Sequence, residues 1–163
     1  MKSYHSVTAK ILELLKADNC WFETFEHQPV RTSEEAAKVR TGYSLEQGAK
    51  AIIVRAKRSK QDKFFLMLVL PGDKRFDVSK VKVLLDAKDI RFATEQEVME
   101  LTNGVEPGGV PPFGNLFDLR VIVDPSLLIF DKIIFNAGDQ RFSIAMLAED
   151  FKKLVKPEVV MIV

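Results

Sequence analysis

The sequence predicts a single α+β domain over residues 1–163, with a mixed, largely antiparallel sheet flanked by helices. Two apolar segments, 51–56 and 64–70, flank a polar turn, a pattern typical of an antiparallel hairpin. Helical and strand patterns then follow one another irregularly, without the strand–helix–strand rhythm of a parallel sheet. A chain of 163 residues is long enough to bury one sizeable core, and no linker composition interrupts it.

The composition is ordinary for a soluble globular protein, with 47% hydrophobic and 29% charged residues. A formal net charge of +1 gives no global attraction to nucleic acid or membrane, so any basic surface must be local. No apolar run approaches the ~20 residues of a membrane span, and the N-terminus lacks a signal-peptide pattern. The single cysteine, Cys20, excludes an internal disulfide and fits a reducing compartment. We therefore expect a cytoplasmic protein with no membrane partner.

The first third of the chain predicts a helix, a strand and a second helix. Apolar residues recur at helical spacing over 7–15, with Ser3 or Ser6 available as the N-cap. The segment 20–27 is rich in β-forming residues and ends before Pro29, so it predicts a strand. Thr32, followed three residues later by a glutamate, predicts a capping box that opens a short helix.

The remaining elements follow the hairpin, whose second strand is apolar enough to be central in its sheet. Ser79 is the expected cap of a helix ending at residue 85, and Thr94 opens another helix with a second capping box. After a loop rich in glycine and proline, the sequence predicts strands at 119–123, 133–136 and 141–146, a helix at 147–154 and a last strand at 159–163.

The loop over residues 103–114, called here the Gly/Pro loop, holds four of the 8 glycines and three of the 7 prolines. Glycine allows the backbone to take positive φ and to approach a ligand closely, whereas proline fixes φ. One interpretation is a long surface connection. The other is a binding loop whose backbone amides face a ligand, and composition alone leaves both open.

Side chains that commonly carry chemistry are few. His5 and His27 have no partner at metal-ligand spacing, and no CxxC, HExxH, Walker A or GxSxG motif is present. Cys20 is more typical of a core thiol than of a nucleophile, and His27 of a strand-end polar residue than of a catalytic base. We therefore predict no metal site, no cofactor and no conventional acid–base machinery.

Lys50 stands at the start of the first hairpin strand, directly before an apolar run. It fits an ordinary charged strand end. It also fits an ammonium group that a rigid strand directs toward an anion such as phosphate. The basic residues of the hairpin turn, between positions 55 and 63, are typical of a solvated surface but could add a modest phosphate-facing patch.

The order of these features resembles the YbaK/prolyl-tRNA synthetase-associated editing-domain family. Lys50 matches the family's key lysine, and residues 108–112 match its GxxxP loop. Two later segments, 124–128 and Phe135-Asn136-Ala137-Gly138, continue the same order. The resemblance runs from about residue 25 to residue 154, and the ordered set is more specific than the GxxxP element alone.

The resemblance implies a barrel-like editing-domain fold and a trans-editing aminoacyl-tRNA deacylase. Family members hydrolyse the ester of a wrong amino acid (alanine, cysteine, serine or threonine) on the 3′ end of a tRNA, typically proline tRNA. They do so without a metal, with the substrate's own hydroxyl or thiol assisting the attack. The implied catalytic residues are Lys50, Gly108 and Gly109, the two glycines through backbone amides. The implied substrate-binding residues are Phe25, His27, Val110, Pro111, Pro112, Phe113, Gly138 and Asp139.

Two departures from the family pattern concern specificity. Phe25 stands where some members have a tyrosine, and the turn 138–141 lacks the Gly-Lys-Arg-Gly pattern of YbaK-type members. The sequence therefore does not choose among the four amino acids. A non-catalytic adaptor that binds a tRNA end or a synthetase is the alternative, and docking on an aminoacyl-tRNA synthetase fits either function. Intact Lys50 and an intact glycine loop favour the enzyme.

Overall fold

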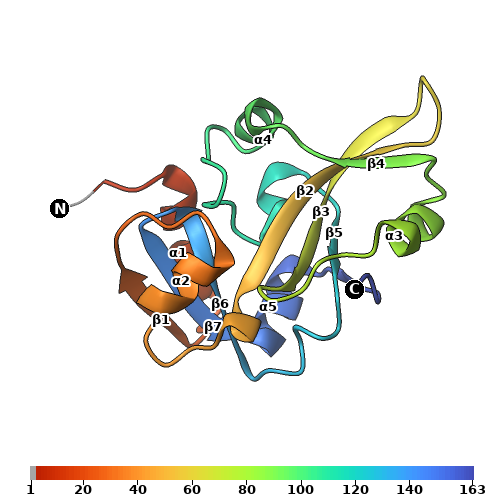
Figure 1. The fold of residues 1–163 in the computed structure, drawn as a ribbon. Coiled ribbons are helices and arrows are strands. Elements are labelled where there is room, and N and C mark those ends of the chain that lie inside the picture. Colours follow the sequence, from red (N-terminus) through yellow and green to blue (C-terminus); the bar gives the residue numbers. More distant parts are fainter. Residues whose placement is uncertain (1–2) are drawn as a thin grey trace.

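The computed structural model describes residues 3–163, whose strands form two sheets (Figure 1). The three-stranded sheet has the order β1 (Phe22–Glu26), β7 (Phe142–Leu147), β6 (Lys132–Asp139). The five-stranded sheet has the order β4 (Asp89–Phe92), β2 (Ala49–Lys57), β3 (Lys63–Pro71), β5 (Val121–Val123), β8 (Glu158–Val159). The helices are α1 (Ser6–Ala17), α2 (Ser33–Val39), α3 (Val78–Leu85), α4 (Glu95–Leu101) and α5 (Ala148–Val155), with short 3₁₀ turns η1 (Leu45–Gln47) and η2 (Gly114–Phe117).

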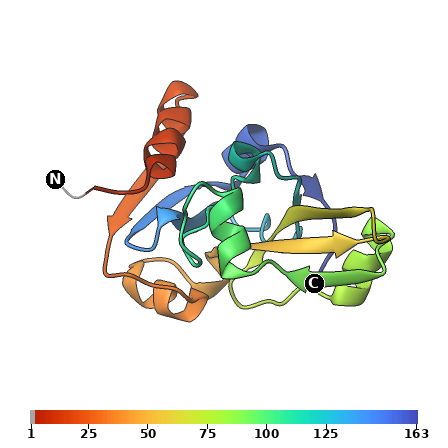
Figure 2. The same ribbon diagram turned by 90° about the horizontal axis from the view of Figure 1, so that it is seen from above.

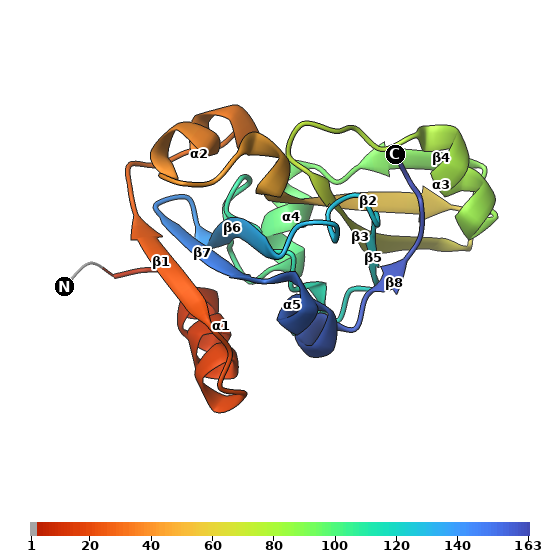
Figure 3. The same ribbon diagram turned by 90° about the horizontal axis from the view of Figure 1, so that it is seen from below.

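The predicted hairpin and the predicted fold class are confirmed. β2 and β3 pair antiparallel along their whole length, and β3 is the central strand of its sheet. β4 pairs antiparallel with β2, whereas β5 and β8 add in parallel, so the sheet is mixed. Figures 2 and 3 show α1 and α2 at one end of the molecule with the three-stranded sheet, and α3 with β4 at the other.

The expected single barrel-like sheet is instead two sheets, which do not close into a barrel in residues 3–163. Between them lies one isolated bridge, from Gly48 to Ile134. The physical reason lies in η1, because the chain turns through this 3₁₀ segment just before β2 and brings Gly48 alone beside β6. The start of β2, where Lys50 lies, is therefore the point at which the two sheets meet.

The five-stranded sheet has a separate core on each face. On β2, Ala49 and Ile53 pack with the three-stranded sheet, α1 and α5. Val54 and Ala56 pack on the opposite face, against α3 and Ile162 near the C-terminus. Because side chains alternate along a strand, Lys50 lies on the second face. Within the described residues, no helix is long and apolar enough to cross a membrane.

The two predicted capping boxes have the expected cap residues, but two other predicted caps are wrong. Thr32 and Thr94 accept hydrogen bonds from the backbone amides three residues on. In α1 the cap is His5, whose Nδ1 accepts from the Val7 amide, instead of Ser3 or Ser6. In α3 the cap is Asp77, two residues before the expected Ser79, because its carboxylate reaches the Lys80 amide.

Two strands also differ from the prediction. β4 has four residues and a charged start, so its sequence carries no clear alternation, and it was not predicted. The predicted strand at 159–163 shrinks to β8, because the last amides, those of Ile162 and Val163, donate to the Asp124 carboxylate instead of to a strand.

Candidate functional site

Lys50 lines a small pocket at the junction of the two sheets. The pocket has a volume of about 50 Å³, and α2, the start of β2 and β6 contribute its lining. Its lining residues are Thr32, Ser33, Ala36, Arg40, Gly48, Ala49, Lys50 and Asn136. A single water molecule needs roughly 10–15 Å³ of cavity volume. The Lys50 pocket therefore has room for a group of only a few non-hydrogen atoms. That is the size of a small amino-acid side chain or a single ester group.

The Lys50 ammonium is half-buried and is held by the loop that follows β3. Its Nζ donates a hydrogen bond to the backbone oxygen of Lys74. Burial lowers the pKa of Lys50, while the nearby Glu34 carboxylate raises it and Arg75 lowers it. Within residues 3–163 Lys50 forms no ion pair. A ligand in the pocket would therefore meet an ammonium group whose charge is not neutralised by direct contact.

Arg40, at the end of α2, places a second cation in the pocket. Its side chain is almost fully buried, with 6% exposed, and burial lowers its pKa to about 10, so the guanidinium stays charged near neutral pH. Nε donates to Ser143 Oγ (3.0 Å) and Nη2 to Asn136 Oδ1 (2.9 Å), but no carboxylate of the described residues pairs with it. A buried unpaired charge is costly, so this one indicates a site built for an anion or a developing negative charge.

The remaining nitrogen of Arg40 is available to a ligand. Nη1 has no hydrogen-bond partner among the described residues, and a Cβ added to Gly48 would lie 3.5 Å from it. Gly48 and Arg40 both line the pocket. A glycine at position 48 thus keeps the approach to Nη1 open.

Asn136 and Ser143 connect the pocket to the Gly/Pro loop and to His27. The two residues face each other across β6 and β7, so their side chains lie on one face. Asn136 Nδ2 donates to the Gly108 backbone oxygen (2.7 Å), and Ser143 Oγ lies 2.8 Å from His27 Nε2. The predicted catalytic loop is therefore one side chain away from Arg40.

His27 belongs to this network but does not line the pocket. Its Nδ1 lies 2.8 Å from the Gln28 backbone oxygen, which can only accept, so Nδ1 carries the hydrogen. Burial lowers the pKa of His27, which favours the neutral ring, and Nε2 then accepts from the Ser143 hydroxyl. Protonated His27 would force that hydroxyl to turn toward Asn136 Oδ1, 3.0 Å away.

The two glycines expected to present amides differ in the structure. Gly108 is exposed, has a φ of +88°, and its amide has no hydrogen-bond acceptor in residues 3–163. Gly109 is buried; its amide donates to Glu106 (2.9 Å) and its oxygen accepts from Gly138 (2.8 Å). The expectation of two free amides is therefore wrong for Gly109 in this conformation, because its own turn uses the donor.

The other loop residues expected to touch substrate hold the loop in place instead. Phe113 is fully buried, with its ring 5.5 Å from Phe135 and 6.0 Å from Phe151, centre to centre, so it has no surface to offer a ligand. Pro111 and Pro112 are buried as well, and Val110 is half-buried against the same core. These four positions thus shape the loop and do not line the Lys50 pocket.

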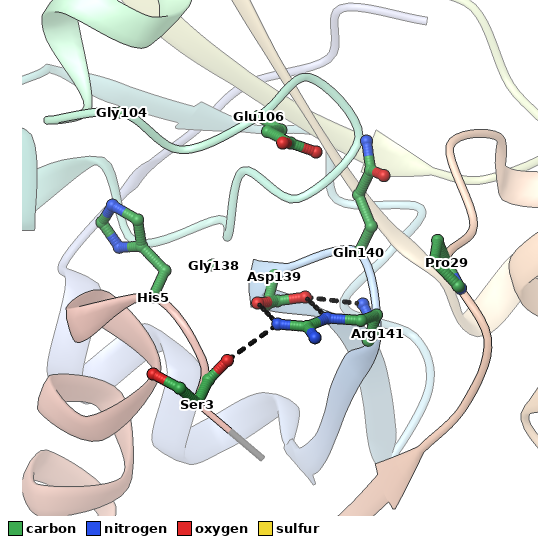
Figure 4. A pocket seen from close by; sticks show the side chains of 9 residues that line it. All are labelled: Ser3, His5, Pro29, Gly104, Glu106, Gly138, Asp139, Gln140 and Arg141. Atoms are coloured by element: carbon green, nitrogen blue, oxygen red, sulfur yellow. Dashed lines mark hydrogen bonds and ion pairs between the residues drawn. The ribbon is translucent and has the colours of Figure 1, made fainter.

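Three further predicted residues lie away from the pocket. Phe25 is half-buried on the Ser143 face of the sheet, with its ring edge-on to Tyr43. Gly138 and Asp139 line a different cavity of about 290 Å³, together with His5 and Glu106 of the Gly/Pro loop (Figure 4).

In that cavity the Asp139 carboxylate is already bound by Arg141. The guanidinium donates from Nε (2.9 Å) and from Nη2 (2.8 Å), as the dashed lines of Figure 4 show. These hydrogen bonds lower the pKa of Asp139 and keep it ionised. We therefore assign Asp139 to the turn between β6 and β7, where it orders Arg141.

The sequence prediction missed three residues of the site: Arg40 and Asn136, which line the pocket, and Ser143, which hydrogen-bonds to both. Asn136 could have been predicted from the sequence, because it belongs to the Phe-Asn-Ala-Gly segment that carries the resemblance. Arg40 and Ser143 have no local signal, since a charged residue at a helix end and a serine in a strand are ordinary in isolation. Their significance comes from the packing of α2 onto the three-stranded sheet.

Known proteins are similar to this chain in sequence and in fold. The chain is 31% identical over 152 residues to the multifunctional Ser/Thr-tRNA deacylase ProXp-y of Escherichia coli K12, covering 93% of this chain and 89% of the relative. It is 26% identical over 119 residues to the proline–tRNA ligase of Ralstonia nicotianae, covering 73% of this chain but 21% of that ligase. The crystal structure of hypothetical protein APE2540 matches with a TM-score of 0.80 at 27% identity, covering 94% and 98% of the two chains.

The profile of the family described as the aminoacyl-tRNA editing domain matches residues 27–154. That range contains Lys50, Arg40, the Gly/Pro loop and both sheets except β1 and β8. The chain belongs to the aminoacyl-tRNA editing domain family.

Proposed function

We propose that this protein is a trans-acting aminoacyl-tRNA deacylase and that the Lys50 pocket binds the ester of the mischarged amino acid. The observation that supports this most is the charge of the pocket, where Lys50 and the buried Arg40 line a space of about 50 Å³ without a carboxylate. Hydrolysis of an ester builds negative charge on the carbonyl oxygen. Preorganised donors aimed at such an oxygen are often the largest single contribution to catalysis.

Each group has a role in this proposal. Water attacks the carbonyl carbon, the ester bond to the ribose breaks, and a proton passes to the ribose oxygen that leaves. The Gly108 amide and Arg40 Nη1 stabilise the negative charge on the carbonyl oxygen. Lys50 binds the terminal phosphate or orients the carbonyl. No side chain of the pocket is a general base at neutral pH, which fits assistance by the substrate's neighbouring ribose hydroxyl or by its own side chain.

Serine and threonine are the amino acids that suit the pocket best. Five of its lining residues have polar side chains that can bind a substrate hydroxyl: Thr32, Ser33, Arg40, Lys50 and Asn136. A site built around hydrogen bonds to a hydroxyl discriminates strongly against an analogue without one, because its polar groups are then left unpaired. The E. coli relative is named for Ser/Thr-tRNA. Proline tRNA is the tRNA that the family resemblance favours.

A deacylation panel tests the substrate. Proline tRNA charged with serine, threonine, alanine or cysteine is incubated with the protein, and kcat/KM is measured for each. We expect serine and threonine to be removed at least about tenfold faster than alanine, a difference of ~1.4 kcal/mol in transition-state binding. Preference for alanine would contradict the proposed specificity. Binding of all four without hydrolysis of any would favour a non-catalytic adaptor.

Metal independence is a separate part of the proposal. No group of three or more histidine, cysteine or acidic side chains in residues 3–163 is arranged to hold a metal ion. We expect deacylation to survive dialysis against a strong chelator. Activity that is lost on chelation and restored by zinc or manganese alone would show that a metal takes part.

A further inference from the structure

An aromatic pair, the exposed Phe92 and the partly buried Phe76, lies on the same face of the five-stranded sheet as Lys50. Lys50 and Val54 point to one side of β2, and Phe92 on β4 is the cross-strand partner of Val54. The Phe92 side chain is 63% exposed, although it is large and apolar. Phe76 supports it, with ring centres 5.7 Å apart and the rings inclined at 65°. The exposed face of Phe92 is thus held in a fixed orientation.

The same pair is continuous with the Lys50 pocket. The loop between β3 and α3 carries Lys74, whose backbone oxygen accepts from Lys50 Nζ, and two residues later Phe76. Figure 3 shows α2 and α3 on the same side of the molecule. Along β2, four residues separate Lys50 from the level of Phe92, a distance of about 13 Å at roughly 3.3 Å per residue. Lys50, Lys74, Arg75, Phe76 and Phe92 are called here the aromatic strip.

The strip carries positive charge that is not fully paired. Lys74 lies 3.7 Å from the Asp73 carboxylate in a largely exposed contact, which has little energetic weight. Arg75 is exposed and has neither an ion pair nor a side-chain hydrogen bond among the described residues. The charge of Arg75 lowers the pKa of Lys50, so the two cations lie near each other. A phosphate backbone that passes between the pocket and Phe92 would meet both.

Exposed aromatic rings beside unpaired cations are the surface that single-stranded nucleic acid uses, because bases stack on rings while phosphates pair with the charges. The strip's span of about 13 Å corresponds to about four stacked nucleotide steps at roughly 3.4 Å, and to fewer in an extended strand. The unpaired 3′ end of a tRNA, whose last ribose carries the ester, has a suitable length and charge.

Building on the proposed function, we propose that the aromatic strip binds the unpaired 3′ end of the tRNA substrate, with a base stacked on Phe92 and a backbone phosphate on Arg75. The strip shares Lys50 with the pocket but extends beyond it, because Arg75 and Phe92 contact nucleotides before the terminal adenosine. It supplies binding energy that depends on the RNA strand and not on the amino acid. Hydrolysis of the ester remains the task of Lys50, Arg40 and Gly108.

Binding of uncharged tRNA tests the inference without relying on catalysis. The Kd is measured for intact tRNA and for the same tRNA lacking its three 3′-terminal nucleotides, with wild type and with Phe92→Ala. We expect Phe92→Ala to weaken binding of the intact tRNA by roughly five- to a hundredfold, the range measured for loss of one stacked base. Binding of the truncated tRNA should not change. Phe92→Trp, which keeps a stacking surface, should retain wild-type affinity for both.

Two further variants separate base stacking on Phe92 from the loss of any exposed apolar side chain and from phosphate binding. Ile129→Ala removes an apolar side chain that is 76% exposed and lies outside the strip, so it should leave both Kd values unchanged. Arg75→Gln should lower the slope of log Kd against log salt by about 0.7, the contribution of one phosphate contact on a single strand.

Equal losses on intact and truncated tRNA, or no loss with Phe92→Ala, would overturn the inference. The second result would leave the exposed ring as a surface for a protein partner. Turnover of mischarged tRNA is measured separately, so wild type that binds the intact 3′ end through Phe92 but hydrolyses nothing would overturn the proposed function alone.

Discussion

At the scale of single residues, the two cations of the pocket differ in how firmly the fold depends on them. Arg40 donates to Ser143 Oγ and to Asn136 Oδ1, so its removal would cost two buried hydrogen bonds to a charged group, at ~1.5–3 kcal/mol each. Lys50 is half-buried on a rigid strand and its one hydrogen bond goes to a loop carbonyl. Lys50 is therefore the residue whose substitution separates catalysis from stability.

Lys50→Ala should lower kcat/KM for deacylation by at least about tenfold, the effect of ~1.4 kcal/mol on the barrier. The melting temperature should stay close to that of wild type, because β2 keeps all its backbone pairing. Lys63→Ala, at the exposed start of β3, is the matched control and should leave both quantities unchanged. Wild-type turnover in Lys50→Ala, at an unchanged melting temperature, would remove Lys50 from the site.

His27 predicts a pH dependence of stability. Burial lowers its pKa in the folded protein below the value of about 6.5 in the unfolded chain. The unfolded state therefore binds more protons as the pH falls, so the contribution of neutral His27 is present above about pH 6.5 and is lost below it. Denaturant melts at about pH 7.5 and 5.5 should show a loss of unfolding free energy that is smaller in His27→Gln. An equal loss in both proteins would assign the effect to other groups.

At the scale of elements, the Gly/Pro loop is fixed by its contacts, and Gly108 combines a positive φ with a close approach to the backbone of Arg31. A Cβ at this position would lie 2.9 Å from the Arg31 Cα, and φ is +88°. Gly108→Ala should therefore lower the melting temperature and also push the ester away from the free amide. In single-turnover experiments on folded protein, kcat should fall more than KM rises, because contacts to the carbonyl oxygen strengthen in the transition state.

Gly42→Ala is the control for backbone strain. Gly42 has a φ of +90°, but a Cβ there would meet nothing within 4 Å, so it carries the strain without the collision. It should lower the melting temperature and leave turnover intact. If Gly108→Ala behaves in the same way, with unimpaired chemistry in the molecules that remain folded, the loop is only a surface connection.

The sequence predicted those elements whose signals are local. The β2–β3 hairpin follows from two apolar runs around a polar turn, and Thr32 and Thr94 follow from cap residues three positions before a glutamate. The pocket depends instead on tertiary packing. Arg40 becomes a site residue only because α2 lies on β6 and β7. The Gly109 amide donates to Glu106 within a turn, and the spacing of residues in the sequence does not predict that hydrogen bond.

At the scale of the whole molecule, the five-stranded sheet separates two cores with different tasks. One core joins the two sheets and so brings the start of β2 beside Asn136 on β6, while the Lys50 side chain itself lies on the other face of β2. The other packs α3 and the C-terminal residues against the opposite face. Asp124, which is 3% exposed, belongs to the second region and does not line the pocket. Changes there should act on the stability of the fold without acting on the chemistry.

Asp124→Asn tests this separation. One carboxylate oxygen accepts from the amides of Ile162 (2.8 Å) and Val163 (3.0 Å), the other from the Ser126 amide (2.9 Å). Burial by itself would raise the pKa of Asp124, but these hydrogen bonds lower it, so its contribution is present above about pH 4 and lost in acid.

The asparagine variant turns one acceptor into a donor that faces backbone amides, which should cost ~1–3 kcal/mol and about 2–4 °C of melting temperature per kcal/mol. Its stability should also fall less than that of wild type between about pH 5 and 3. Turnover per folded molecule should stay at the wild-type value, because Lys50, Arg40 and Gly108 keep their places. A loss of turnover in fully folded Asp124→Asn would show that the second core positions the pocket as well.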